Sequence, residues 1–116
     1  MRLLFENDEL DNLIYKYHLF IYSRIGNDCY LCFAGDGPSS FIGAYSRYSG
    51  KAYLFDSIHL KHDKIVGDKN KRHDYIEVEP FEKHLNELII QRKKILSDIK
   101  ERKMKKDFKW TKMKLL

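Results

Sequence analysis

Two close pairs of cysteine and histidine residues form the pattern in this sequence that comes nearest to a metal site. Two residues separate Cys29 from Cys32, and two separate His59 from His62. Two sulfur and two nitrogen ligands are a set that tetrahedral zinc takes. The cysteines lie, however, in the apolar run Cys-Tyr-Leu-Cys-Phe-Ala, which is typical of a strand, and strand residues three apart point to opposite faces. We therefore predict buried structural cysteines, and we predict no metal and no cofactor.

Three histidines could serve in acid–base chemistry, because an imidazole titrates near neutral pH. His59, His62 and His73 lie in one polar stretch, and an aspartate follows each of the last two. They are the candidate catalytic residues of a small metal-free nuclease or toxin. The sequence supplies no nucleophile or oxyanion-hole motif beside them, and a histidine next to an aspartate among lysines is typical of solvated surface. We expect a protein that is not an enzyme, with the histidine-dependent nuclease as an alternative.

The glycine-rich stretch 35–40 has some of the composition of a phosphate-binding loop. Such loops need a run of free backbone N–H groups, which usually open a helix together with a lysine. Here Pro38 removes one N–H group and the Asp36 carboxylate repels phosphate. The stretch is therefore predicted to be a hairpin loop.

Aromatic residues on two predicted strands could stack on nucleic-acid bases. Segments 45–48 and 53–55 bring tyrosines, a phenylalanine and Arg47 onto adjacent strands. Exposed rings on a sheet stack the bases of single strands. Tyr and Phe in alternating strands are also often part of the hydrophobic core, so a base-stacking role and a core role both stay open.

The strongest feature is a segregation of charge. Residues 1–60 carry five Lys or Arg against seven Asp or Glu, whereas residues 92–116 carry eleven against three, a net charge of +8. A surface of this kind fits an anionic partner, and phosphate backbones reward such density through counterion release. A solvated helix face is the plainer explanation. The candidate nucleic-acid or partner-binding residues are Arg92, Lys93, Lys94, Lys100, Arg102, Lys103, Lys105, Lys106, Lys109, Trp110, Lys112 and Lys114.

These residues need elements to position them, and the first such element is ambiguous. Leu10, Leu13, Ile14 and Tyr17 recur at helical spacing, which predicts a short helix over residues 8–17, with Asn7 or Asp8 as its cap. Alternation from residue 13 to 21 would instead start a strand early, and it would be unusually long. We favour the short helix.

The middle of the chain is predicted to be a meander of antiparallel strands. The runs 18–25 and 29–34 are split by turn residues 26–28, and strands at 40–46 and 51–58 follow. Residues 59–73 are polar and are predicted to be a mobile loop. Alternation over residues 74–79 predicts a fifth strand with one wet face.

A long helix is predicted from about residue 80 to 106. Pro80 suits a helix start, and apolar residues then recur at helical spacing as far as Ile99. The predicted fold class is α+β: a β-meander of about five strands, a short N-terminal helix and a long basic C-terminal helix packing its first half on one sheet face. Residues 1–106 form a single domain in this interpretation, and residues 107–116 form a basic and aromatic tail.

The function expected from these features is binding without catalysis. We predict a nucleic acid or a nucleoprotein complex as the partner of the basic helix. The alternative is a protein partner, for a phage-type inhibitor or adaptor in host takeover or anti-defence, such as an anti-CRISPR protein. Two cysteines, no signal-like start and no long apolar run predict a cytoplasmic protein without a membrane partner. The oligomeric state stays open.

Overall fold

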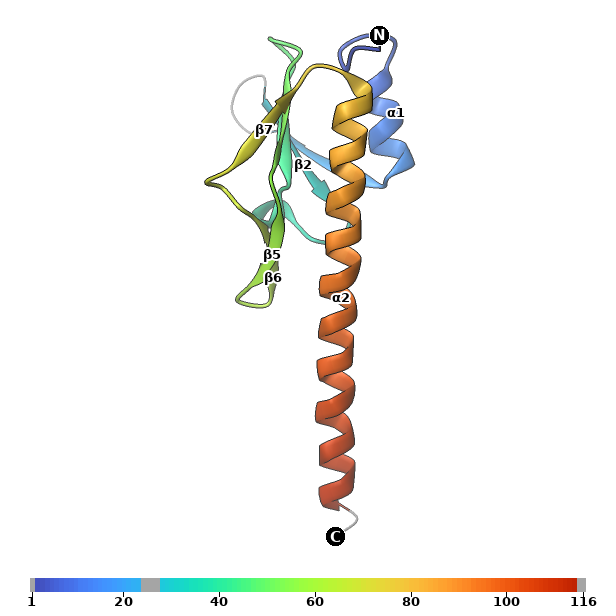
Figure 1. Ribbon diagram of the computed structural model, residues 1–116, viewed down its shortest axis with the longest axis vertical. Helices are drawn as coiled ribbons and strands as arrows, with labels where there is room; N and C mark the ends of the chain where they lie inside the picture. The colour runs from blue at the N-terminus through green and yellow to red at the C-terminus, as the bar shows by residue number, and fades with distance from the viewer. Residues whose placement is uncertain (1, 24–27, 115–116) are drawn as a thin grey trace.

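The computed structural model describes the backbone of residues 2–23 and 28–114, and the side chains of residues 2–22, 28–37 and 39–103. Two α-helices, a short 3-10 helix and seven strands follow one another along the chain (Figure 1). In order they are α1 (Glu9–Lys16), β1 (Leu19–Ser23), β2 (Asp28–Phe33), η1 (Pro38–Ser40), β3 (Gly43–Ser46), β4 (Ala52–Phe55), β5 (Ile58–Lys61), β6 (Lys64–Gly67), β7 (Arg72–Tyr75) and α2 (Val78–Lys114).

Five strands form an antiparallel sheet in the order β1-β2-β3-β4-β7. The predicted α+β fold is therefore confirmed, with a short first helix and a long last one. Residues 9–16 are helical rather than the start of a long strand, because Leu10 and Leu13 are buried on one side of that helix. Asp8 precedes α1 without a capping side-chain hydrogen bond, so the cap predicted there is absent.

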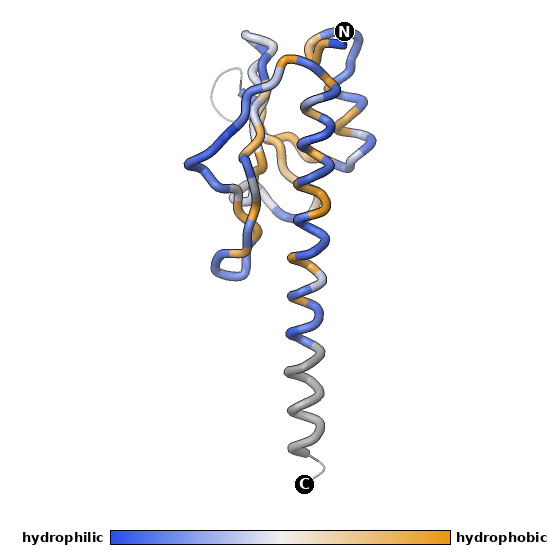
Figure 2. Tube along the Cα trace, viewed as in Figure 1, coloured by the Kyte–Doolittle hydropathy of each residue, from blue (hydrophilic) through white to orange (hydrophobic). Residues whose placement is uncertain are grey.

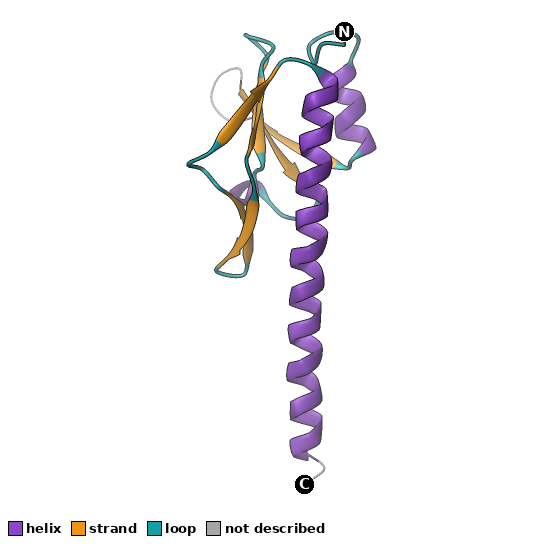
Figure 3. Ribbon diagram, viewed as in Figure 1, coloured by secondary structure: helices purple, strands orange, loops and turns teal. Residues whose placement is uncertain are grey.

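Both α-helices lie on the same side of the sheet (Figure 3). The core fills the space between them, and the first four turns of α2 supply Val78, Phe81, Leu85 and Leu88, all fully buried. Leu31 and Leu54 of the central strands meet them from the sheet with no exposed surface. The predicted packing of the first half of the long helix is thus confirmed.

Beyond this core, α2 runs on as a single projecting helix (Figure 1). The molecule measures 64 × 29 × 24 Å as a result. The helix was predicted to end near residue 106, but it continues to Lys114. The sequence after Pro80 contains no glycine or proline to stop it, and Lys, Glu and Arg are good helix formers.

Residues 59–73, predicted to be a mobile loop, contain the antiparallel hairpin β5–β6. That prediction was wrong because the turn, His62-Asp63, carries no glycine or asparagine. Both of its residues nevertheless adopt positive φ, at 50° and 63°, as a two-residue hairpin turn of type I′ requires. Ile58 and Ile65 bury the hairpin in the core, and the Ile58 N–H donates to Oε1 of Gln91 in α2 at 3.0 Å.

Several predicted bounds also shift. The strand predicted at 40–46 starts at Gly43 after η1, and the one predicted at 51–58 ends at Phe55. The last strand, predicted at 74–79, lies at Arg72–Tyr75, because Val78 already begins α2 with its side chain in the core. Part of the predicted strand 18–25 and turn 26–28 falls on residues 24–27, which lie outside the described residues.

Candidate functional site

The basic part of α2 is where most of the predicted binding residues lie. Five of them have exposed side chains on the helix as it leaves the core: Lys93, Lys94, Lys100, Arg102 and Lys103, which we call the basic arm. None of the five pairs with another side chain that the structure describes. Six more lie where side chains are not described: Lys105, Lys106, Lys109, Trp110, Lys112 and Lys114. In Figure 2 the described stretch of the helix beyond the core is mostly hydrophilic, with a few apolar residues among the charged ones.

Arg92, the first residue of the predicted set, is engaged differently. Its Nε and Nη2 atoms donate to the two carboxylate oxygens of Asp36, at 2.9 and 2.8 Å. Its guanidinium also lies over the Phe33 ring, 5.2 Å from the centroid. The hydrogen bonds from Arg92 to Asp36 raise the pKa of the guanidinium. Arg92 therefore fastens α2 to the loop after β2, and its charge is already neutralised within the fold.

The three predicted catalytic histidines lie on different elements. His59 is exposed on β5, and His62 is exposed in the β5–β6 turn. His73 lies on β7 and lines a cleft of about 330 Å³, whereas His59 lines another of about 310 Å³. The structure therefore places His73 and His59 in separate clefts, and it does not bring the three histidines together.

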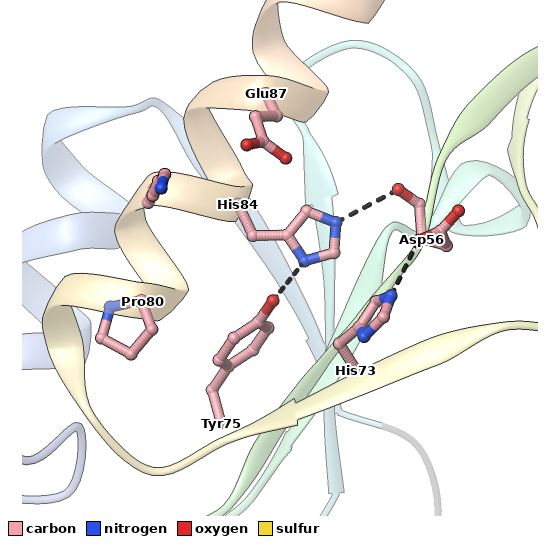
Figure 4. A pocket seen from close by; sticks show the side chains of 7 residues that line it. Asp56, His73, Tyr75, Pro80, His84 and Glu87 are labelled. Carbon is pink, nitrogen blue, oxygen red and sulfur yellow. Dashed lines mark hydrogen bonds and ion pairs between the residues drawn. The ribbon is translucent and has the colours of Figure 1, made fainter.

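The cleft at His73 lies between the sheet and the start of α2 (Figure 4). Its side chains are Asp56, His73, Tyr75, Pro80, Lys83, His84 and Glu87. His73 Nε2 lies 2.7 Å from Oδ1 of Asp56, and this hydrogen bond lowers the pKa of the carboxyl group. About half of each side chain is exposed, so this imidazole is accessible to a substrate.

His84, which the sequence analysis did not select, is the buried member of this cluster. Its Nε2 lies 3.2 Å from the Asp56 backbone oxygen, and its Nδ1 lies 2.8 Å from the Tyr75 hydroxyl. A carbonyl only accepts, so Nε2 carries a proton, and in the Nε2-protonated tautomer Nδ1 accepts the Tyr75 O–H. Both nitrogens are thus occupied, which suits a structural role. The sequence did hold a signal for its burial, because His84 lies between Phe81 and Leu88 on the apolar stripe of the helix.

The cysteines of the predicted metal pattern are both buried and unpaired in β2. Cys29 shares its side of the strand with core residue Leu31, and Cys32 points to the other side, where its Sγ lies 3.7 Å from the Phe20 carbonyl oxygen. Burial raises the pKa of the Cys32 thiol. Among the described residues, no group of three or more His, Cys, Asp or Glu side chains could hold a metal ion.

The predicted aromatic set divides between the two sides of the sheet. Tyr45 packs against the core, and Tyr48 is 89% exposed in the β3–β4 turn, next to the exposed Arg47. Tyr53 and Phe55 share the side away from the helices, with ring centroids 5.7 Å apart, and Phe55 is buried there. The sequence alone did not show which of these rings are exposed, because exposure depends on the turns and on the register of the strands.

Comparison with known proteins gives no relative. No protein-family model, curated protein or solved structure matches this chain. Within the described residues, no helix combines the length and apolar character needed to cross a membrane. Among the described residues, two features are candidates for binding or catalysis: a projecting arm of exposed cations, and the cleft that holds the accessible imidazole of His73.

Proposed function

We propose that this protein binds nucleic acid through the basic arm of α2, by contact with phosphates and without reading sequence. The observation that supports this is the exposure of Lys93, Lys94, Lys100, Arg102 and Lys103 along the part of α2 where the helix leaves the core. Of the cations from Arg92 to Lys103, only Arg92 is used by the described part of the fold.

The physics of polyanion binding favours such an arrangement. Each phosphate that a cation neutralises releases condensed counterions, so affinity depends on the number of accessible cations and falls steeply with salt. A helix rises about 1.5 Å per residue, so exposed cations from residue 93 to 103 span about 15 Å of a phosphate backbone. The positive charge continues in sequence to Lys114.

The test is fluorescence anisotropy of the full chain with a generic DNA duplex over a series of salt concentrations. We compare the wild type with the triple variant Lys93→Gln, Lys94→Gln and Lys100→Gln. If each lysine neutralises one phosphate, the slope of log affinity against log salt falls in magnitude by about 2.7 in this variant.

The matched control removes the same number of charges outside α2, with Arg47→Gln, Lys61→Gln and Lys64→Gln. All three of these cations are exposed in turns or at the hairpin tip. The control should keep the wild-type slope. An equal decrease of the slope in both variants would show that only net charge matters. Absence of duplex binding at low salt would overturn the proposal.

A second candidate function, cleavage of RNA, is favoured by the His73–Asp56 pair alone. An imidazole held by a carboxylate can take the proton of a ribose 2′-hydroxyl as that oxygen attacks the adjacent phosphorus. The P–O5′ bond then breaks, the 5′-oxygen leaves with a proton from the imidazolium or from water, and a 2′,3′-cyclic phosphate remains. Incubation of the full chain with single-stranded RNA in a metal chelator tests this function. Cleavage that His73→Ala abolishes and His59→Ala leaves intact would establish it, whereas intact RNA would exclude it.

A further inference from the structure

One face of the five-stranded sheet, the outer face, turns away from both helices (Figure 3). Alternate residues of each strand point to opposite faces, and Leu19, Leu31 and Leu54 point to the core. Their neighbours therefore lie on the outer face. Its side chains include Phe20, Tyr22, Tyr30, Tyr53, Arg72 and Asp74.

The rings on this face run across neighbouring strands. Tyr22 lies opposite Tyr30, Tyr30 opposite Ala44, and Ala44 opposite Tyr53. Phe20 is 52% exposed and contacts Tyr22, with ring centroids 5.0 Å apart. The small Ala44 side chain lies between Tyr30 and Tyr53, whose backbones are two strand spacings, roughly 10 Å, apart, and it is only 4% exposed.

Cations lie directly against two of the aromatic rings, those of Tyr53 and Phe41. The Arg72 guanidinium carbon is 4.7 Å from the centroid of the Tyr53 ring, and the Lys69 Nζ atom is 5.5 Å from the centroid of Phe41. Phe41 joins the row through edge-on contact with Tyr30 at 5.1 Å. Tyr53 and Phe41 thus each combine an aromatic surface with a nearby positive charge.

A groove of about 250 Å³ opens on this face at Ala44 and Tyr53. Lys51 and Arg72 line it beside the carboxylates of Asp28 and Asp74. Flat rings, cations for phosphate and acceptors for exocyclic amino groups are the three kinds of contact that an unpaired base with its phosphate uses.

We propose that the outer face binds single-stranded nucleic acid by stacking bases on Tyr53 and its aromatic neighbours, with Arg72 and Lys51 next to the phosphates. This inference rests on the proposed function and assigns its substrate class. Duplex bases are stacked inside the helix and do not reach a sheet surface, so only single strands use this face. The basic arm contacts the phosphates of both forms.

The experiment compares the affinity of the full chain for a single-stranded oligonucleotide, as RNA and as DNA, with its affinity for the duplex of the same sequence. Tyr53→Leu removes the ring and keeps an apolar side chain. Loss of one stacked base should weaken single-strand binding by about tenfold and leave duplex binding unchanged. Arg72→Gln, at an exposed position, should act in the same direction without touching the core.

The control is Tyr15→Leu, which removes an 86% exposed ring from α1 on the opposite side of the sheet and should change neither affinity. Thermal unfolding verifies that each variant is folded. If Tyr53→Leu does not fold, the Arg72→Gln variant provides the test.

Unchanged single-strand affinity in a folded Tyr53→Leu or Arg72→Gln variant would overturn the stacking inference, while salt-dependent duplex binding would still support the arm. No binding of either form would remove both. A change in sedimentation with these variants, and none in affinity, would assign the face to a second copy of the chain.

Discussion

At the scale of single residues, His84 is the side chain whose surroundings are most completely defined. It is 5% exposed and connects α2 to the end of β4 through Asp56 and to β7 through Tyr75. Burial raises the pKa of the Tyr75 hydroxyl, which therefore stays a donor to the ring. A buried polar group satisfied at both ends favours one unique docking of helix on sheet.

Replacing His84 tests this network. We expect His84→Leu to lower the free energy of unfolding by about 2–3 kcal/mol, because it leaves the Asp56 carbonyl and the Tyr75 hydroxyl without their partner. Tyr75→Phe removes one of these bonds and should cost about 1 kcal/mol. Urea denaturation measures both. Lys83→Ala, at the exposed neighbouring position, should change stability by less than about 0.5 kcal/mol, and an equal cost in all three would contradict the network.

A second prediction at this scale concerns acid pH. Glu82 Oε1 accepts from the Lys16 ammonium at 2.8 Å and from the Tyr17 hydroxyl at 2.7 Å, and these bonds lower the pKa of the carboxyl group below 4.5. The ionised form is therefore favoured in the folded state. Its stabilisation is present above the unfolded pKa and is lost as pH falls through the folded pKa.

We expect Glu82→Gln to reduce the loss of stability between about pH 6 and about pH 3, relative to the wild type. Urea unfolding at a series of pH values measures this. Glu6→Gln removes one exposed carboxylate and serves as the control, with the wild-type profile expected. Identical profiles for the wild type and Glu82→Gln would show that the contacts with α1 do not contribute to acid sensitivity.

At the scale of elements, the attachment of α2 is the decisive feature. The Arg92–Asp36 pair closes the region where the helix leaves the core, and both side chains are at least three-quarters buried. A guanidinium makes two parallel bonds to a carboxylate, whereas an ammonium acts as a point charge. The charge is kept in Arg92→Lys, so this variant isolates geometry from charge.

We expect Arg92→Lys to lower the free energy of unfolding by about 1–2 kcal/mol and to leave the salt dependence of nucleic-acid binding unchanged. Denaturation and anisotropy on the same preparation measure the two effects. Lys93→Gln, one position along the helix, should show the reverse: little change in stability and a smaller salt slope. A smaller slope in Arg92→Lys would instead place Arg92 among the phosphate contacts.

At the scale of the whole molecule, the projecting end of α2 is separable from the fold. Full burial along the described part of the helix ends at Leu88, and the last half-buried side chain is Ile99. Deleting residues 104–116 should therefore change the free energy of unfolding by less than about 0.5 kcal/mol. It should weaken duplex binding, because five lysines are removed.

Denaturation and anisotropy of the shortened chain test this, with a chain ending at Gln91 for contrast. The shorter chain loses Arg92 and Ile95, which contact Asp36 and the core, and should be less stable. Equal destabilisation by the two deletions would mean that the end of α2 contributes to the fold.

The sequence by itself determined the fold class and the concentration of cations after residue 92, and it favoured a helix over residues 8–17, which the structure shows at residues 9–16. These follow from local pattern: an apolar stripe at a period of 3.6 is already a helix face, and charge is counted without coordinates. The continuation of α2 to Lys114 was missed although the sequence held its signal, the absence of glycine and proline.

Only the tertiary structure decided which of these residues act together. The β5–β6 hairpin was hidden because its turn lacks the usual residues and its stability comes from burying Ile58 and Ile65 under α2. The partners of His73, His84 and Arg92 lie 17, 28 and 56 positions away in sequence, so no spacing reveals them. The side on which each tyrosine lies depends on strand register, and register is set by packing against the helices.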